Sequence, residues 1–169
     1  MPPSKKELKG AVKYGADPKT GIKYGASPKT GVHFGADPDS IFQHNPSWRF
    51  SICDIDQDSR WAFTESRLST EFWQHIFPRL RALESMTWAD ILIVGKKANH
   101  AINPEDLNKG ARDRLDALQI ETEAVISLRV NGVCRLYGIL EGPVYKILWY
   151  DNDHGDNLTC VCRSHKKHT

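Results

Sequence analysis

The stretch SLRVNGVCRLYGILEGPVYKILWYDNDHG, residues 127–155, decides the fold predicted from this sequence. Large apolar residues alternate with polar ones along it, which is the pattern of β-strands. Asn131-Gly132 is a strong hairpin signal between two such runs, and Glu141-Gly142-Pro143 indicates a second turn. With the residues just before it, the stretch predicts an antiparallel β-meander with strands at about residues 124–130, 133–140 and 143–150.

Strand alternation divides the side chains of the meander between two faces of the sheet. One face is predicted to form a core under the helices, with Ile126, Leu128, Val130, Cys134, Leu136, Leu140, Tyr145, Ile147 and Trp149. The other is predicted to carry cations and tyrosines, namely Arg129, Arg135, Lys146, Tyr137 and Tyr150. Arginine donates to phosphate and tyrosine stacks on bases. The pattern alone favours an ordinary solvated face, with an RNA-binding face as the alternative.

The region upstream of the meander predicts a strand followed by helices. Residues 48–56 alternate like a strand, and residues 61–63 suggest a return strand. Ser69 is expected to cap a helix that Pro78 kinks or divides; its apolar stripe is Phe72, Ile76, Leu80 and Leu83. A short helix is expected from Thr87 to Gly95.

A third helix is expected to start at Asn103-Pro104, an Asn cap followed by Pro at the first helical position. Its buried stripe would be Leu107, Ala111, Leu115 and Leu118. Residues 158–163 are expected to add a last strand. This order of elements predicts an α+β domain over residues 41–169, an antiparallel meander packed by two or three helices on one face of the sheet.

Composition narrows the class of protein. The 169 residues are 40% hydrophobic and 26% charged, with a net charge of +2, as in ordinary globular domains. Residues 1–40 carry seven Lys and four Asp or Glu, a net +3, which leaves −1 for the rest. A general nucleic-acid binder would be clearly basic, so any anion site must be a local patch. The sequence has no apolar run of membrane-spanning length and no secretory signal, which predicts a cytoplasmic protein with reduced cysteines and no membrane partner.

Residues 11–40 contain a repeat of ten residues, read as AVKYGADPKT, GIKYGASPKT and GVHFGADPDS. Gly and Pro in every unit prevent a continuous helix, and three short units bury little surface. Residues 1–40 are therefore predicted to be a flexible extension. The alternative is an arm that orders on a partner through Tyr14, Tyr24 and Phe34 and that contacts RNA through Lys13, Lys23 and Lys29.

The meander resembles the C-terminal sheet of the RelE/HigB/ParE-type toxins of bacterial toxin–antitoxin systems. Over residues 127–154 the HigB branch shows a Ser-aliphatic-Arg-aliphatic-Asn run, an Arg in the next strand, a Gly turn, and a strand ending in Asp and His. The matching residues are Ser127, Leu128, Arg129, Val130, Asn131, Arg135, Gly142, Asp151 and His154. The family usually has Asp-x-His, whereas this chain has one residue more, Asp151-Asn152-Asp153-His154.

The resemblance implies a RelE-like fold and a metal-independent endoribonuclease that cuts mRNA, often on the ribosome, and that a cognate antitoxin neutralises. On that reading Arg129 and Arg135 stabilise the phosphate charge, and His154 is the acid or base. Asp151 would orient His154 or position the RNA. No cofactor is implied. ParE-type members act on gyrase, so the fold alone leaves the activity open.

Further candidates for RNA contact lie outside the meander. Lys96, Lys97 and His100 are expected in a basic loop, and Lys166 and Lys167 in a basic tail, each with a solvated segment as its alternative. Four possible metal ligands lie within nine residues, namely Cys160, Cys162, His165 and His168. That spacing is closer than usual for zinc, which favours a strand with a solvated tail and leaves zinc as the lesser alternative.

Two other functions stay open from the sequence. The first is a non-enzymatic binding module whose repeat arm and basic sheet face engage a protein or nucleic acid. The second is a nucleic-acid binder stabilised by zinc at the C-terminal Cys and His residues.

Overall fold

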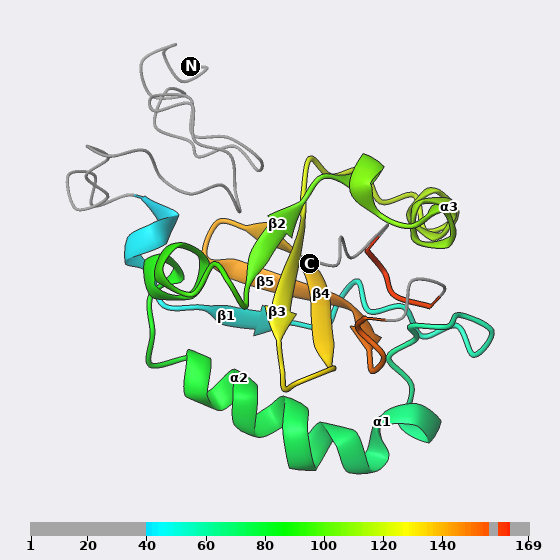
Figure 1. Ribbon diagram of the computed structural model, residues 1–169, viewed down its shortest axis with the longest axis horizontal. Helices are drawn as coiled ribbons and strands as arrows, with labels where there is room; N and C mark the ends of the chain where they lie inside the picture. Colours follow the sequence, from blue (N-terminus) through cyan, green and yellow to red (C-terminus); the bar gives the residue numbers. More distant parts are fainter. Residues whose placement is uncertain (1–39, 156–158, 163–169) are drawn as a thin grey trace, which may run out of the picture.

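The computed structural model describes residues 40–155 and 159–162 of the chain. Its centre is a five-stranded mixed sheet in the order β1-β5-β4-β3-β2 (Figure 1). β3 (Val125–Arg129), β4 (Arg135–Glu141) and β5 (Val144–Asp151) form the predicted antiparallel meander. β2 (His100–Ile102) pairs antiparallel with β3, and β1 (Ser47–Arg49) pairs parallel with β5. The α+β class is confirmed. Of the predicted extension at residues 1–40, all but Ser40 lies outside the described residues.

The helical layer on one face begins with a helix that changes form along its length. It consists of α1 (Glu65–Glu71), the π-helical η4 (Phe72–Ile76) and α2 (Phe77–Leu83). Pro78 has no amide hydrogen and would collide with the preceding turn of a regular helix, so the wider π turn just before it accommodates the ring. The helix starts after Thr64 rather than at Ser69, as the sequence had suggested.

Two shorter elements complete this layer. The 3₁₀ turn η3 (Ile41–Gln43) is capped by Ser40. The π-helical η5 (Asp90–Val94) follows the predicted cap, in which the backbone amide and hydroxyl of Thr87 donate to the Asp90 carboxylate. The amide of Gly95 donates to the Asp90 carbonyl and ends the helix where it was expected to end.

The third helix starts later than the sequence suggests. Asn103-Pro104 opens only the 3₁₀ turn η6 (Pro104–Asp106), and α3 (Lys109–Ala117) begins after Asn108, whose side chain accepts from the Ala111 amide. Each asparagine precedes a helical turn. The side chain of Asn108 makes a capping hydrogen bond, whereas that of Asn103 makes none. The predicted stripe is confirmed, with Leu107, Ala111 and Leu115 buried and Leu118 packed beside them.

Helices cover both faces of the sheet, not one face as expected (Figure 1). Leu80 and Leu83 of α2 and Ile91 of η5 pack with the predicted core face of the meander. On the opposite face, Leu115 of α3 packs with Tyr137, Leu148, Trp149 and Val161. The face that alternation assigned to solvent is therefore largely a second core.

A β-bulge between β4 and β5 explains the main error in the predicted faces. The register shifts at Tyr137/Gly138, with Tyr137 opposite Trp149 and Gly138 opposite Ile147. Leu148 and Trp149 consequently both pack on the α3 side, while Tyr150 packs on the α2 side. Trp149 was expected in the first core and Tyr150 on the cationic face, and both predictions are wrong because one extra residue reverses strict alternation.

The segment between β1 and α1 does not form the predicted strands. Within residues 48–56 only 48 and 49 belong to β1, and residues 61–63 form none. Asp54 is buried and forms an ion pair with Arg114 of α3 at 2.6 Å. Burial alone would raise the pKa of Asp54, but hydrogen bonds, first from Arg114 and then from Ser59, lower it to about 2. This ion pair ties the segment to α3, while the Asp54 amide donates to the Leu148 carbonyl of β5 at 3.0 Å.

The last strand expected at residues 158–163 is also not formed in the part that the structure describes. Residues 159–162 make a single bridge, between Cys162 and Leu107. Among the described residues, no helix is long and apolar enough to cross a membrane.

Gly138→Ala should destabilise the protein by about 2 kcal/mol, because overpacking of a close contact carries a cost of that order. A Cβ at this position would collide with the Lys146 carbonyl oxygen and would lie 2.7 Å from the Tyr145 ring. Urea denaturation measures the change. Gly132→Ala is the matched control, since a Cβ there meets nothing within 4 Å. Equal stability of the two variants would contradict the assigned role of the bulge.

Candidate functional site

Three of the residues predicted to be catalytic lie in a row across three neighbouring strands. Arg129 of β3 is the register partner of Arg135 of β4, and Arg135 is the register partner of Asp151 of β5. His154 follows three residues after Asp151, and its backbone amide donates to the Val133 carbonyl at 2.9 Å. The structure therefore brings Arg129, Arg135, Asp151 and His154 together at the β3–β4 end of the sheet.

The hairpin between β3 and β4 orients two of the arginines. Asn131 closes the loop by accepting from the amides of Val133 and Cys134 through its side-chain oxygen. Its backbone carbonyl accepts from Nε of Arg129 at 3.0 Å and from a guanidinium nitrogen of Arg135 at 2.9 Å. The Asn131-Gly132 signal thus marks a five-residue loop, rather than a two-residue turn, that holds the arginines side by side.

A third arginine joins them from the helical layer. Nε of Arg79, in α2, donates to the Arg129 carbonyl at 2.9 Å. Burial and the charge of Arg129 lower the pKa of Arg79, and the same two causes lower the pKa of Arg135. Within the described residues, no carboxylate forms an ion pair with Arg79, Arg129 or Arg135. Arg129 repels both Arg79 and Arg135, and the charge of Asp151 opposes this effect at Arg135. The three cations make this end of the sheet suited to an anion.

Asp151 does not contact His154 directly through a hydrogen bond between their side chains. It is buried, and its two carboxylate oxygens accept from the backbone amides of Asp153 at 3.0 Å and Val161 at 3.2 Å. The first bond closes the turn that leads to His154. The second bond holds the C-terminal segment, residues 159–162. Asp151 therefore holds two chain segments, the turn before His154 and the segment with the two cysteines, next to each other.

The C-terminal segment is held at three further places. The backbone amide and the side-chain amide of Asn108 donate to the carbonyls of Val161 at 2.8 Å and Cys160 at 2.9 Å. Nε1 of Trp61 donates to the Thr159 carbonyl at 2.9 Å. These bonds fix both cysteines of the segment on backbone that is anchored to α3 and to β5.

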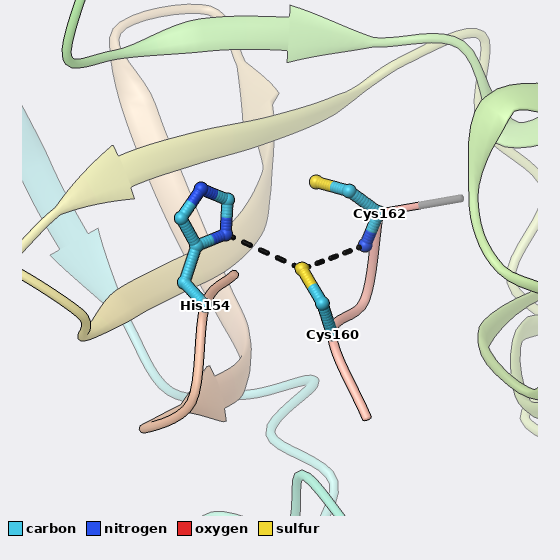
Figure 2. Close-up of side chains that lie close together, drawn as sticks. All are labelled: His154, Cys160 and Cys162. Carbon is cyan, nitrogen blue, oxygen red and sulfur yellow. Dashed lines mark hydrogen bonds between the residues drawn. The ribbon is translucent and has the colours of Figure 1, made fainter. Parts of the chain in front are cut away.

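Figure 2 shows His154, Cys160 and Cys162 pointing toward one another. Nδ1 of His154 lies 3.3 Å from Sγ of Cys160, and the ligand atoms of all three residues lie within 4.8 Å of one another. The Tyr137 hydroxyl lies 3.3 Å from Nδ1 of His154 and 3.4 Å from Sγ of Cys162. The hydrogen bond with Cys160 lowers the pKa of Cys162 against the effect of burial, and the bond with Tyr137 adds to that lowering. These groups can exchange protons or hold a soft metal ion.

The structure separates the other predicted RNA-contact residues. Lys146 lies away from the arginine row and forms an ion pair with Glu141 at 2.6 Å. The Tyr150 hydroxyl donates to Glu71 on the opposite face of the sheet. Tyr137 is fully buried, so its ring is not open to a base.

The basic segment before β2 lies at the arginine end of the sheet. Lys96 and Lys97 are in a turn, and His100 starts β2 instead of lying in a loop. Asn99 links this turn to the row, since its side-chain oxygen accepts from the Arg129 amide at 2.9 Å. Lys166 and Lys167, with His165 and His168, lie outside the described residues.

Sequence reasoning missed Arg79 and the approach of His154 to the cysteine pair. Arg79 occupies a helix in which nothing local distinguishes it from Arg81, because only tertiary packing brings it to Arg129. The Cys-x-Cys spacing was visible, but the sequence did not indicate that His154, after the end of β5, lies beside it. Family models, curated proteins and solved structures were compared with this chain, and none matches it.

Asp151→Ala should free both segments that the carboxylate holds. We expect faster amide hydrogen exchange at Asp153 and Val161, and a loss of about 2 kcal/mol in stability, because the buried Val161 amide and the partly buried Asp153 amide lose their acceptor. Exchange followed by NMR measures the effect. Asp113→Ala is the control, since Asp113 forms an exposed ion pair with Lys109 on the surface of α3. Unchanged exchange at Val161 would show that Asp151 does not position the segment.

Proposed function

We propose that the protein is a RelE/HigB-like toxin that cleaves mRNA as a metal-independent endoribonuclease. The observation that carries the proposal is the cluster of Arg79, Arg129 and Arg135 at the β3–β4 loop, whose Val133 carbonyl accepts from the amide of His154. The family resemblance of residues 127–154 supplies the reaction and the substrate class. A cytoplasmic location and a cognate antitoxin as partner belong to the same proposal.

The arginines differ in their access to a ligand. Arg129 is exposed, so its guanidinium is the candidate for direct contact with a phosphate. Arg79 is half-buried and adds charge from the helical layer. Arg135 is only 8% exposed, and its guanidinium donates to loop carbonyls of Asn131 and Cys134. Arg135 is therefore mainly a positioning residue that also adds positive potential.

His154 would carry the proton in the reaction. A neutral imidazole accepts the proton of the RNA 2′-hydroxyl while that oxygen attacks the adjacent phosphorus. The arginines stabilise the negative charge of the phosphorane. The bond to the 5′-oxygen then breaks, and the imidazolium returns its proton to that oxygen. The products are a 2′,3′-cyclic phosphate and a 5′-hydroxyl, so atoms and charge balance without a metal.

A second candidate function is a binding module without catalysis. It is favoured by the burial of Arg135 and Asp151, whose polar groups are engaged by backbone partners. On this alternative the exposed Arg129 binds an anionic partner and the other residues shape the fold.

Purified full-length protein should cleave a short single-stranded RNA and leave a 2′,3′-cyclic phosphate, and its expression should arrest bacterial growth. His154→Ala should lower the rate by about 100-fold or more. Arg129→Ala should lower it by about 100-fold.

Arg49→Ala is the matched control, an exposed arginine on the far edge strand β1, and should keep full activity. Harmless expression without RNA cleavage would refute the nuclease. Salt-sensitive RNA binding without cleavage, lost in Arg129→Ala, would support the binding module instead.

A further inference from the structure

We infer that His154, Cys160 and Cys162 form a binding site for one zinc ion. The inference stands on the geometry of these three side chains and does not require the proposed nuclease activity. It differs from the zinc site that the sequence suggested, because it includes His154, which follows the end of β5, as a nitrogen ligand.

The distances fit tetrahedral zinc. Zinc binds thiolate sulfur at about 2.3 Å and imidazole nitrogen at about 2.0 Å, which places neighbouring ligand atoms about 3.5 to 3.8 Å apart in a tetrahedron. Nδ1 of His154 and Sγ of Cys160 are 3.3 Å apart, and all three ligand atoms lie within 4.8 Å of one another (Figure 2). Small side-chain rotations are enough to close the site, and the fourth position is left for water or another ligand.

The backbone around the ligands is already fixed. Cys160 and Cys162 flank Val161, which is fully buried in the α3 core and whose amide is bonded to Asp151. His154 sits on a turn tied to Val133. Because the fold positions both segments without a metal, binding would cost little chain entropy.

Groups around the ligands match a zinc–thiolate centre. The Cys162 amide contacts Sγ of Cys160 at 3.4 Å, and the Tyr137 hydroxyl lies at the same distance from Sγ of Cys162. Both are donors suited to a bound thiolate. Two thiolates and a neutral imidazole carry a charge of −2, so the complex with Zn²⁺ is electrically neutral, which lowers the cost of burying the ion.

Zinc and proton transfer would compete for the same imidazole ring. A His154 ring bound through Nδ1 keeps its proton on Nε2, so the ring no longer acts as a base. If the proposed nuclease activity holds, zinc therefore acts as its inhibitor. The metal site itself is tested by binding and not by activity.

Metal-free full-length protein titrated with Zn²⁺ should bind one equivalent, and Co²⁺ should give thiolate-to-metal charge-transfer absorption. Cys160→Ser, Cys162→Ser and His154→Ala should each weaken binding by about 100-fold or more. Tyr137→Phe should weaken it by about 10-fold, as for loss of a group that supports a ligand.

Cys53→Ser is the matched control, because it removes a thiol whose sulfur donates to the Ile147 carbonyl away from the site. It should bind both metals like the unaltered protein. Circular dichroism checks that each variant folds, and if one cysteine variant fails to fold, the other and His154→Ala still decide. The inference is overturned if the unaltered protein binds no zinc, if the cobalt spectrum lacks thiolate bands, or if the folded ligand variants bind as tightly as Cys53→Ser.

Discussion

The buried carboxylate of Asp151 is the interaction on which the candidate site depends. Its two oxygens accept from amides of two chain segments, Asp153 before His154 and Val161 between the cysteines. A buried carboxylate needs such partners, and backbone amides satisfy it at little cost in side-chain entropy. One side chain thus sets the distance between His154 and the Cys-x-Cys pair, although it belongs to neither group. The family resemblance implied that Asp151 orients His154 or positions the RNA. The hydrogen bond to the Asp153 amide is compatible with the first of these roles, acting through the backbone.

The second constraint is a sheet that is buried on both faces. The first core lies under α2 and η5, and the second lies under α3 and the C-terminal segment. Little of the sheet face remains for a ligand, and the reactive groups gather where β3, β4 and β5 end. There Arg129, the Asn131 loop and His154 come together. The Asp54–Arg114 ion pair ties α3 to the segment between β1 and α1.

The sequence was informative wherever the physics is local. The three strands, the first core and the caps at Thr87 and Gly95 followed from alternation and from turn chemistry. The resemblance named Arg129, Arg135 and Asp151 as site residues, and the register places them side by side across β3, β4 and β5. Alternation of apolar and polar residues could not predict the bulge at Gly138. Trp149 and Tyr150 were therefore each assigned to the wrong face of the sheet. β1 and β2 have three residues each, too short for a periodic signal, and Arg79 reaches Arg129 only through tertiary packing.

The two proposals give His154 two roles, as the acid or base in RNA cleavage and as a ligand of zinc. The most direct measurement is the rate of RNA cleavage by metal-free protein during a zinc titration. The account predicts cleavage to a 2′,3′-cyclic phosphate without metal and a linear fall in rate to near zero at one zinc per chain. A rate that is unchanged at one bound zinc, or cleavage that appears only when zinc is added, would contradict it.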